Sequence, residues 1–348
     1  MNLLGKKSRE FIVEPFDSSR TRFSQLVKSD VNEQGESKFP ARRMFIGAND
    51  MTVQEVDMMN KIETNVTYFN MPEENFGAFV KRTTISNLDE KDAVHLSVLD
   101  GLARIQPAGG KLETNLKLMG RTLEGFMSVE QAGADGDLTM PFFKLSEIPD
   151  DGAAVVVEEA GNFCLSYIEN REKSLLPIVY DTNKVFGEDT SLLRPMGLYE
   201  KSVKDIVKEK QYGASRTSSA FAAVDDVTIY PGQHITITSF YGKADLITEL
   251  PVFAKRIAQG GFAQYKLSRA RALIQQITMV AETVTADHIF DKHVEQMVLD
   301  NSLMGGTPVL LGDVDVNGLN ADDDERIKVY HLFSRRGDLE RDYDKVSI

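Results

Sequence analysis

Hydrophobic and polar residues alternate with a period of two in many short stretches of the first two thirds of the chain. In DAVHLSVLDGLARIQP, Val94, Leu96 and Val98 alternate with His95 and Ser97. This period places the apolar side chains on one face of an extended chain and the polar ones on the other. The segment therefore predicts a half-buried β-strand.

Two further stretches carry the same signal, each with a turn. GAAVVVEEAGNFCLSYIE, residues 152–169, contains two β-branched or aromatic runs joined by EAGN, the pattern of a hairpin. In VTIYPGQHITIT, Pro231 and Gly232 occupy the central positions of a type II turn, and isoleucines alternate with threonines after it. Strands and polar turns recur without intervening amphipathic helices, which favours a large antiparallel β-sandwich over a doubly wound α/β fold.

The pattern changes to a helical period after about residue 245. An apolar stripe of helical spacing consists of Leu267, Ala270, Ile274, Ile277 and Ala281. A second helix is predicted from about Ala286, with Thr285 as its N-cap and with apolar positions Ile289, Phe290, Val294, Met297 and Val298. Gly305, Gly306 and Pro308 end it. We therefore expect a sandwich domain (1–245), a helical linker (246–305) and a short third part (306–348).

The charge balance and the single cysteine limit the expected partners and the expected location of the protein. Lys and Arg number 40 against 53 Asp and Glu, a net charge of −13, which argues against a broad surface for nucleic acid or for an anionic membrane. Cys164 is the single cysteine, so no intramolecular disulfide can form, and the N-terminus lacks an apolar region of signal-peptide length. The cytoplasm is the expected location.

Four motifs suggest metal, phosphate or thiol chemistry, and each has a simpler interpretation. DVDVNGLNADDD, from Asp313 to Asp324, has the spacing of a calcium loop but ends in Asp rather than Glu, which favours a solvated hairpin loop. His288 and His293 are five residues apart, whereas zinc pairs on one helix sit four apart. QPAGGKLETN lacks the spacing of a phosphate-binding loop. Cys164 lies in an apolar strand and is expected to be buried and inert.

Carboxylate pairs are frequent but poorly placed for catalysis. The doublets are Asp150–Asp151, Glu158–Glu159 and Asp225–Asp226. Cleavage of a glycosidic bond needs groups on opposite sides of that bond. Adjacent residues on a strand face opposite sides of the sheet, so polar turns explain the doublets better.

The C-terminal stretch RRGDLERDY is the richest in candidate binding groups. It holds Arg335, Arg336, Asp338, Glu340, Arg341 and Asp342. Arginines beside carboxylates can form a fixed network for sugar hydroxyls or for an oxyanion. A salt-bridged turn at a domain boundary is the structural alternative, and chemistry alone favours that alternative.

A resemblance to a known family bears on this stretch. VYHLFSRRGDLERDY, with HIFDKHVEQMVLDNSLMGGTPV before it and LSVLDGLARIQP far upstream, resembles the N-terminal half of inverting β-glucan phosphorylases, which are cellobiose-phosphorylase-like enzymes. It is most similar to the branch that acts on β-1,3-glucan oligosaccharides. The resemblance implies a supersandwich, linker helices and the start of an (α/α)6-barrel domain, whose catalytic Asp and sugar-site motifs do not occur in this sequence.

The resemblance also implies a reaction for the whole enzyme. Inorganic phosphate, as co-substrate, cleaves a β-glucan oligosaccharide with inversion and gives α-glucose 1-phosphate, without a metal or organic cofactor. Arg335, Asp338, Arg341 and Asp342 are the implied substrate-binding residues. The 348 residues alone are expected to be inactive.

Two readings without catalysis remain open. The first is a stand-alone carbohydrate-binding sandwich, although such modules commonly use exposed aromatic platforms and this chain has no Trp. The second is an oligomerising module, such as a homodimer, because a large sandwich offers broad faces to a partner subunit.

Overall fold

Antiparallel β-sheets dominate the protein, and most of its longer helices lie in the C-terminal part. The computed structural model describes residues 2–6, 11–14, 41–58, 60–107, 117, 120–134, 136–147, 158–169, 171, 174–279, 283–303, 308–311 and 327–330. Contacts divide the chain into two units. The first comprises Met1–Ile46 and Asp50–Leu267, and the second comprises Gly47–Asn49 and Ser268–Ile348.

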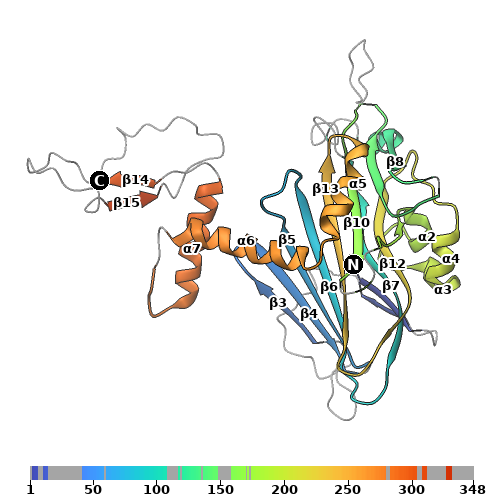
Figure 1. Ribbon diagram of the computed structural model, residues 1–348, viewed down its shortest axis with the longest axis horizontal. Helices are drawn as coiled ribbons and strands as arrows, with labels where there is room; N and C mark the ends of the chain where they lie inside the picture. Colours follow the sequence, from blue (N-terminus) through green and yellow to red (C-terminus); the bar gives the residue numbers. More distant parts are fainter. Residues whose placement is uncertain are drawn as a thin grey trace, which may run out of the picture. The chain divides into compact units, whose positions relative to one another are not determined.

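Two sheets form the sandwich of the first unit (Figure 1). The five-stranded sheet has the order β11–β12–β7–β1–β2, with bounds β1 Asn2–Lys6, β2 Phe11–Glu14, β7 Val94–Ile105, β11 Ile178–Val179 and β12 Ser218–Ile229. The eight-stranded sheet has the order β3–β4–β5–β6–β13–β10–β9–β8. Its bounds are β3 Ala41–Ile46, β4 Asp50–Asp57, β5 Ile62–Asn70, β6 Ala78–Asn87, β8 Met127–Gln131, β9 Pro141–Leu145, β10 Gly161–Ile168 and β13 His234–Ala244.

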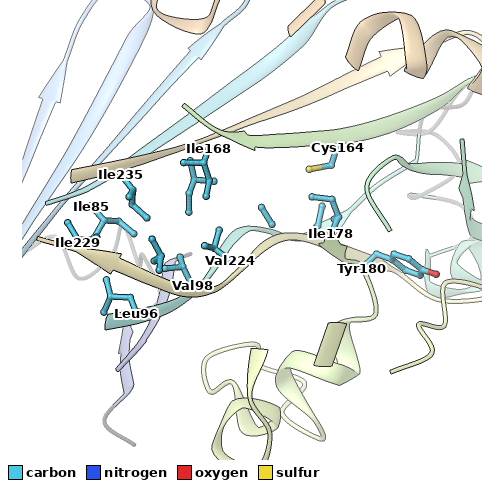
Figure 2. Packing of buried hydrophobic residues seen from close by; sticks show 14 of the residues in the cluster. Ile85, Leu96, Val98, Cys164, Ile168, Ile178, Tyr180, Val224, Ile229 and Ile235 are labelled. Carbon is cyan, nitrogen blue, oxygen red and sulfur yellow. The ribbon is translucent and has the colours of Figure 1, made fainter. Parts of the chain in front are cut away.

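The main core lies between these sheets, so the predicted β-sandwich is confirmed. Leu96 and Val98 of β7 are fully buried in it, opposite Ile85 of β6 and Ile237 of β13. Figure 2 shows side chains from the two layers of strands meeting in this space. The alternation predicted for β7 is confirmed, since the intervening His95 is exposed.

One charged pair crosses the core. Lys81 of β6 and Asp100 of β7 form an ion pair whose side chains are both fully buried. The Thr83 hydroxyl donates a second hydrogen bond to the Asp100 carboxylate at 2.9 Å. Asp100 shares the parity of Leu96 and Val98 along β7, so the strand directs it between the sheets.

The predicted turn at Pro231–Gly232 is confirmed. The Gln233 N–H donates to the Tyr230 carbonyl at 2.9 Å, and Gly232 has a φ of +68°, as the third position of a type II turn requires. The turn connects β12 to β13, which belong to different sheets. It therefore carries the chain from one layer of the sandwich to the other.

Three short helices cover the outer face of the five-stranded sheet, which corrects the expectation of no helices before residue 245. They are α2 (Thr182–Phe186), α3 (Met196–Glu200) and α4 (Val203–Lys208). Their apolar side chains pack with Leu99 of β7 and Phe221 of β12 in a second core. Each helix is only one or two turns long, too short for a helical period to appear in the sequence.

The outer face of the eight-stranded sheet carries the next helical segment. This segment comprises η4 (Ile247–Glu249) and α5 (Leu250–Ile257). The earlier 3-10 helix η3 (Gly120–Phe126) directly precedes β8, and its Leu123 packs against Met127 and Leu145. Phe253 of α5 stacks on Phe76 with ring centroids 3.9 Å apart. Lys266, at the start of the next helix, bonds the Glu74 carboxylate at 2.7 Å and is almost fully buried. These contacts fix the first helices after the sandwich.

Two longer helices and a hairpin follow. They are α6 (Phe262–Thr278), α7 (His288–Leu303), β14 (Pro308–Leu311) and β15 (Ile327–Tyr330), and the two strands pair antiparallel. The prediction of Thr285 as the N-cap of α7 is wrong. The Asp287 carboxylate accepts the Ile289 N–H at 2.9 Å, whereas the Thr285 hydroxyl accepts the N–H of Asp287, which lies before the helix.

Candidate functional site

The four residues predicted to bind substrate lie outside the described residues. They are Arg335, Asp338, Arg341 and Asp342. The acidic loop from Asp313 to Asp324, the Asp150–Asp151 doublet, the first arm of the predicted hairpin at 153–157 and most of QPAGGKLETN also lie outside them. The structure therefore places none of these groups.

The histidines and the cysteine fall on described elements. His288 and His293 are both exposed on α7. Cys164 of β10 is fully buried, as predicted, and burial raises the pKa of its thiol to about 12. Across the described residues, no three His, Cys, Asp or Glu side chains come together in a group that could hold a metal ion.

The Asp225–Asp226 doublet marks an irregularity in β12. The pairing of β12 with β7 shifts register between Val224 and Val227, so these two residues form a bulge. Asp226 has a φ of +54°, a left-handed conformation that Asp tolerates better than most residues. The Asp225 carboxylate accepts a hydrogen bond from the Ser97 hydroxyl at 3.1 Å. The doublet thus shapes the strand.

A small polar cavity lies beside the turn between β12 and β13. Its volume is about 160 Å³, and its lining comes from the segment after β10 and from the ends of β12 and β13. The lining residues are Glu169, Arg171, Thr228, Ile229, Gln233, His234, Ile235 and Thr236. We refer to this site as the polar cavity.

Glu169 is held rigidly at the wall of the polar cavity. Arg82 of β6 donates to both of its carboxylate oxygens, at 2.8 and 2.7 Å, and the Thr238 hydroxyl donates at 2.7 Å. The hydrogen bonds that Arg82 donates to Glu169 raise the pKa of Arg82. Because both oxygens are already occupied, Glu169 serves as a fixed acceptor rather than as a free acid or base.

The remaining lining groups suit a ligand rich in hydroxyls. Gln233 carries an amide, His234 an imidazole, and Thr228 and Thr236 hydroxyls, of which the Thr236 hydroxyl is paired with the Thr84 hydroxyl at 3.0 Å. The Thr228 hydroxyl also bonds His95 Nδ1 at 2.9 Å. These groups can bind and orient a small polar molecule.

Sequence reasoning did not single out this cavity, although one signal pointed to it. Arg82 and Thr84 of β6 face Thr238 and Thr236 of β13 in register, on the side of the sheet away from the core. A run of polar residues at alternate positions of two neighbouring strands marks a polar face. Glu169 follows β10 and could not be paired with Arg82 without knowing the strand order.

Comparisons with known proteins give little further guidance. No protein-family model matches the sequence, and no curated protein matches it. Among solved structures, the chain aligns with one titled "Putative kojibiose phosphorylase from human microbiome", with a TM-score of 0.33 and 8% identity, over 92% of this chain and 29% of that chain. This chain therefore spans less than a third of that protein's length. A superposition this loose carries no information about function.

None of the helices in the described part of the chain combines the length and the apolarity needed to cross a membrane.

Proposed function

We propose that this chain is the N-terminal, non-catalytic portion of a carbohydrate phosphorylase that acts on β-glucan oligosaccharides. The order of its elements is the observation that carries the proposal. A two-sheet antiparallel sandwich is followed along the chain by α6 and α7, and β7 contains LDGLARI of the LDGLARIQP motif of the resemblance. The sandwich and the linker helices thus come in the order that the resemblance implies.

In the proposed whole enzyme, a carboxylic acid of the following (α/α)6 barrel protonates the leaving oxygen. Inorganic phosphate attacks the opposite face of the sugar, in the role that water has in an inverting hydrolase. The product is α-glucose 1-phosphate. In this proposal, Arg335, Asp338, Arg341 and Asp342 form the rim of the sugar site, because guanidinium groups beside carboxylates bind hydroxyls and oxyanions in fixed geometry.

The first test is the size of the native polypeptide. An antibody against this segment should detect, in the source cells, a band far heavier than 38.8 kDa. The protein captured by that antibody should release phosphate from α-glucose 1-phosphate when β-glucan oligosaccharides are supplied as acceptors. A native band at 38.8 kDa, or a heavier protein without phosphate release, would contradict the proposal.

The second test addresses the proposed substrate residues within that longer polypeptide. Arg341→Ala should reduce phosphorolysis strongly while the melting temperature stays nearly unchanged. Arg341→Lys is the matched control, since it keeps the charge but loses the bidentate geometry, and it should recover little activity. An equal loss of activity and stability would instead indicate a salt-bridged structural turn.

A second candidate is a stand-alone module that binds carbohydrate or a partner subunit. The polar cavity favours the binding version, because its lining presents amide, imidazole and hydroxyl groups. Exposed apolar side chains on α7 favour the oligomerising version: Ile289 is 69% exposed, Phe290 51% and Leu303 72%. β-Glucan binding by the isolated chain supports the first version, and concentration-dependent sedimentation that Phe290→Ser abolishes supports the second.

A further inference from the structure

A second, larger cavity lies along β12, in the first unit of the chain. Its volume is about 390 Å³, within the range of small-molecule sites. Valines supply much of its wall, with Val203 and Val207 from α4 and Val224 and Val227 from β12; Leu176 and Pro177 precede β11. We refer to it as the apolar cavity.

The apolar cavity exists because the edge of the five-stranded sheet is incomplete. The edge strand β11 has only two residues, which pair with Phe221 and Ala222. One more bond reaches Ala223, whose N–H donates to the Pro177 carbonyl at 2.9 Å. Beyond it, β7 is the only described strand that pairs with β12. The bulge at Asp225–Asp226 then breaks the regular edge, and the space beside it stays open.

Three cations border this apolar space. Lys204 and Lys208 are four residues apart on α4, so they lie on the same side of that helix, and Arg171 lines both the apolar and the polar cavity. All three are exposed. Within the described part of the chain, none of them makes a hydrogen bond or an ion pair.

Each nearby carboxylate among the described residues has a hydrogen-bond partner other than these three cations. Asp225, the acid in the lining, accepts the Ser97 hydroxyl. Asp205 lies between the two lysines in the sequence, and its carboxylate accepts a hydrogen bond from the Ser202 hydroxyl at 2.6 Å. That bond, with smaller electrostatic contributions from Lys208 and Lys204, lowers the pKa of Asp205. Glu169, at the neighbouring polar cavity, is paired with Arg82. Three cations that form no ion pair with a described residue therefore lie beside an apolar wall, in a chain with a net charge of −13.

We propose that the apolar cavity binds a small organic anion with an apolar body. The anionic group lies between Lys204, Lys208 and Arg171, and the apolar body lies against the valines of α4 and β12. The charged group of such a ligand thus contacts the cations of the site, and its apolar body contacts the valines. An inorganic anion lacks the apolar body, and a neutral amphiphile lacks the charge, so both bind more weakly than the complete ligand.

Octanoate is a suitable probe, and isothermal titration calorimetry on the full chain measures its binding. Octanol and inorganic phosphate test the two halves separately. Octanoate should bind saturably at one site, more tightly than octanol or inorganic phosphate. Its affinity should fall as the ionic strength rises. The double variant Lys204→Gln/Lys208→Gln should raise the Kd for octanoate at least about fivefold and leave octanol binding unchanged.

Lys255→Gln is the matched control, because Lys255 is an exposed lysine of α5 outside the cavity lining. This variant should bind octanoate like the parent chain. Val207→Thr, nearly isosteric, should weaken octanoate and octanol alike. Circular dichroism and thermal unfolding establish that each variant is folded. Absence of saturable octanoate binding to the parent chain, or equal affinity of the parent and the double-lysine variant, would overturn the proposal.

Discussion

The Lys81 ammonium of the eight-stranded sheet and the Asp100 carboxylate of the five-stranded sheet form an ion pair inside the sandwich, with no exposed surface on either side chain. Burial lowers the pKa of Lys81, and the adjacent Asp100 carboxylate opposes that shift. A buried charge without its partner has a large desolvation cost, so each residue depends on the other. Together with the hydrogen bond from Thr83 to Asp100, the pair links the two sheets across a mainly apolar core.

Removing one member of this pair should destabilise the protein strongly. Lys81→Met leaves the Asp100 carboxylate buried without its cation, which typically costs about 3–5 kcal/mol of unfolding free energy. The double variant Lys81→Met/Asp100→Leu should recover most of that loss, because neither charge is then buried. Urea denaturation of the three proteins measures both effects. A single variant as stable as the parent would show that the pair contributes little.

The position of this pair could be predicted from the sequence only in part. Asp100 has the same parity as Leu96 and Val98, so the alternation that predicts β7 also places a carboxylate on its core-facing side. On β6, Lys81 likewise alternates in step with Thr83 and Ile85, which are both fully buried. The sequence does not show that Lys81 and Asp100 face each other across the core, because β6 and β7 are consecutive strands that belong to different sheets.

Gly101 should tolerate no side chain. A Cβ atom at this position would lie 1.9 Å from the Ala220 carbonyl oxygen and 2.6 Å from the Phe221 Cα, both backbone atoms of β12. Gly101→Ala should therefore lower the unfolding free energy by roughly 1–3 kcal/mol or more, since overpacking forces the two strands apart. Chemical denaturation provides the measurement.

Gly77→Ala is the matched control for Gly101→Ala. A Cβ atom at Gly77 has no heavy atom within 4 Å. This substitution should leave the unfolding free energy nearly unchanged or raise it slightly, because alanine restricts the unfolded chain. If both variants lost the same stability, crowding at Gly101 would not be the cause.

Cys164 should resist alkylation in the folded protein. Burial raises the pKa of its thiol to about 12, so little of the reactive thiolate forms at pH 8, and none of the side chain is exposed. Iodoacetamide should label the native chain very slowly and the urea-unfolded chain fully, as read by mass spectrometry. Because the chain has a single cysteine, the mass change reports this position alone. Rapid labelling of the native protein would contradict its burial.

Acid should weaken the turn between β6 and β7. The Asp89 carboxylate accepts from Lys61 at 2.8 Å and from the Lys91 N–H at 3.0 Å, and these bonds lower its pKa from 3.8 to about 2. A depressed carboxyl pKa gives stability that is present above the unfolded pKa and is lost as the pH falls towards the folded value. The contribution of Asp89 should therefore disappear between about pH 4 and pH 2.

Melting temperatures between pH 6 and pH 2 test this dependence. Asp89→Asn should melt below the parent at pH 6 and approach it as the pH falls to 2. Glu90→Gln changes the neighbouring, exposed acid and should run parallel to the parent. A constant difference between the parent and Asp89→Asn across the range would exclude ionisation of Asp89 as the source of the stability.

The sequence predicted the sandwich better than it predicted the binding surfaces. The period of two in β7 and the Pro231–Gly232 turn are local signals, and the structure confirms both. The cavities depend on relations between distant segments, such as the short β11 beside β12 and the Arg82–Glu169 pair. Local patterns carry no information on which strand ends the sheet, so such sites become visible only once the strands are paired.

The strand order also has a consequence for biosynthesis. In the eight-stranded sheet, β13 lies between β6 and β10. In the five-stranded sheet, β7 lies between β12 and β1. Early strands such as β6 and β7 therefore lack one of their pairing partners, and part of their apolar surface stays uncovered, until β12 and β13 have been synthesised as far as Ala244. Pairings this distant along the chain form slowly and leave the nascent protein open to aggregation. The sandwich can therefore be completed only after the last of its strands has been synthesised.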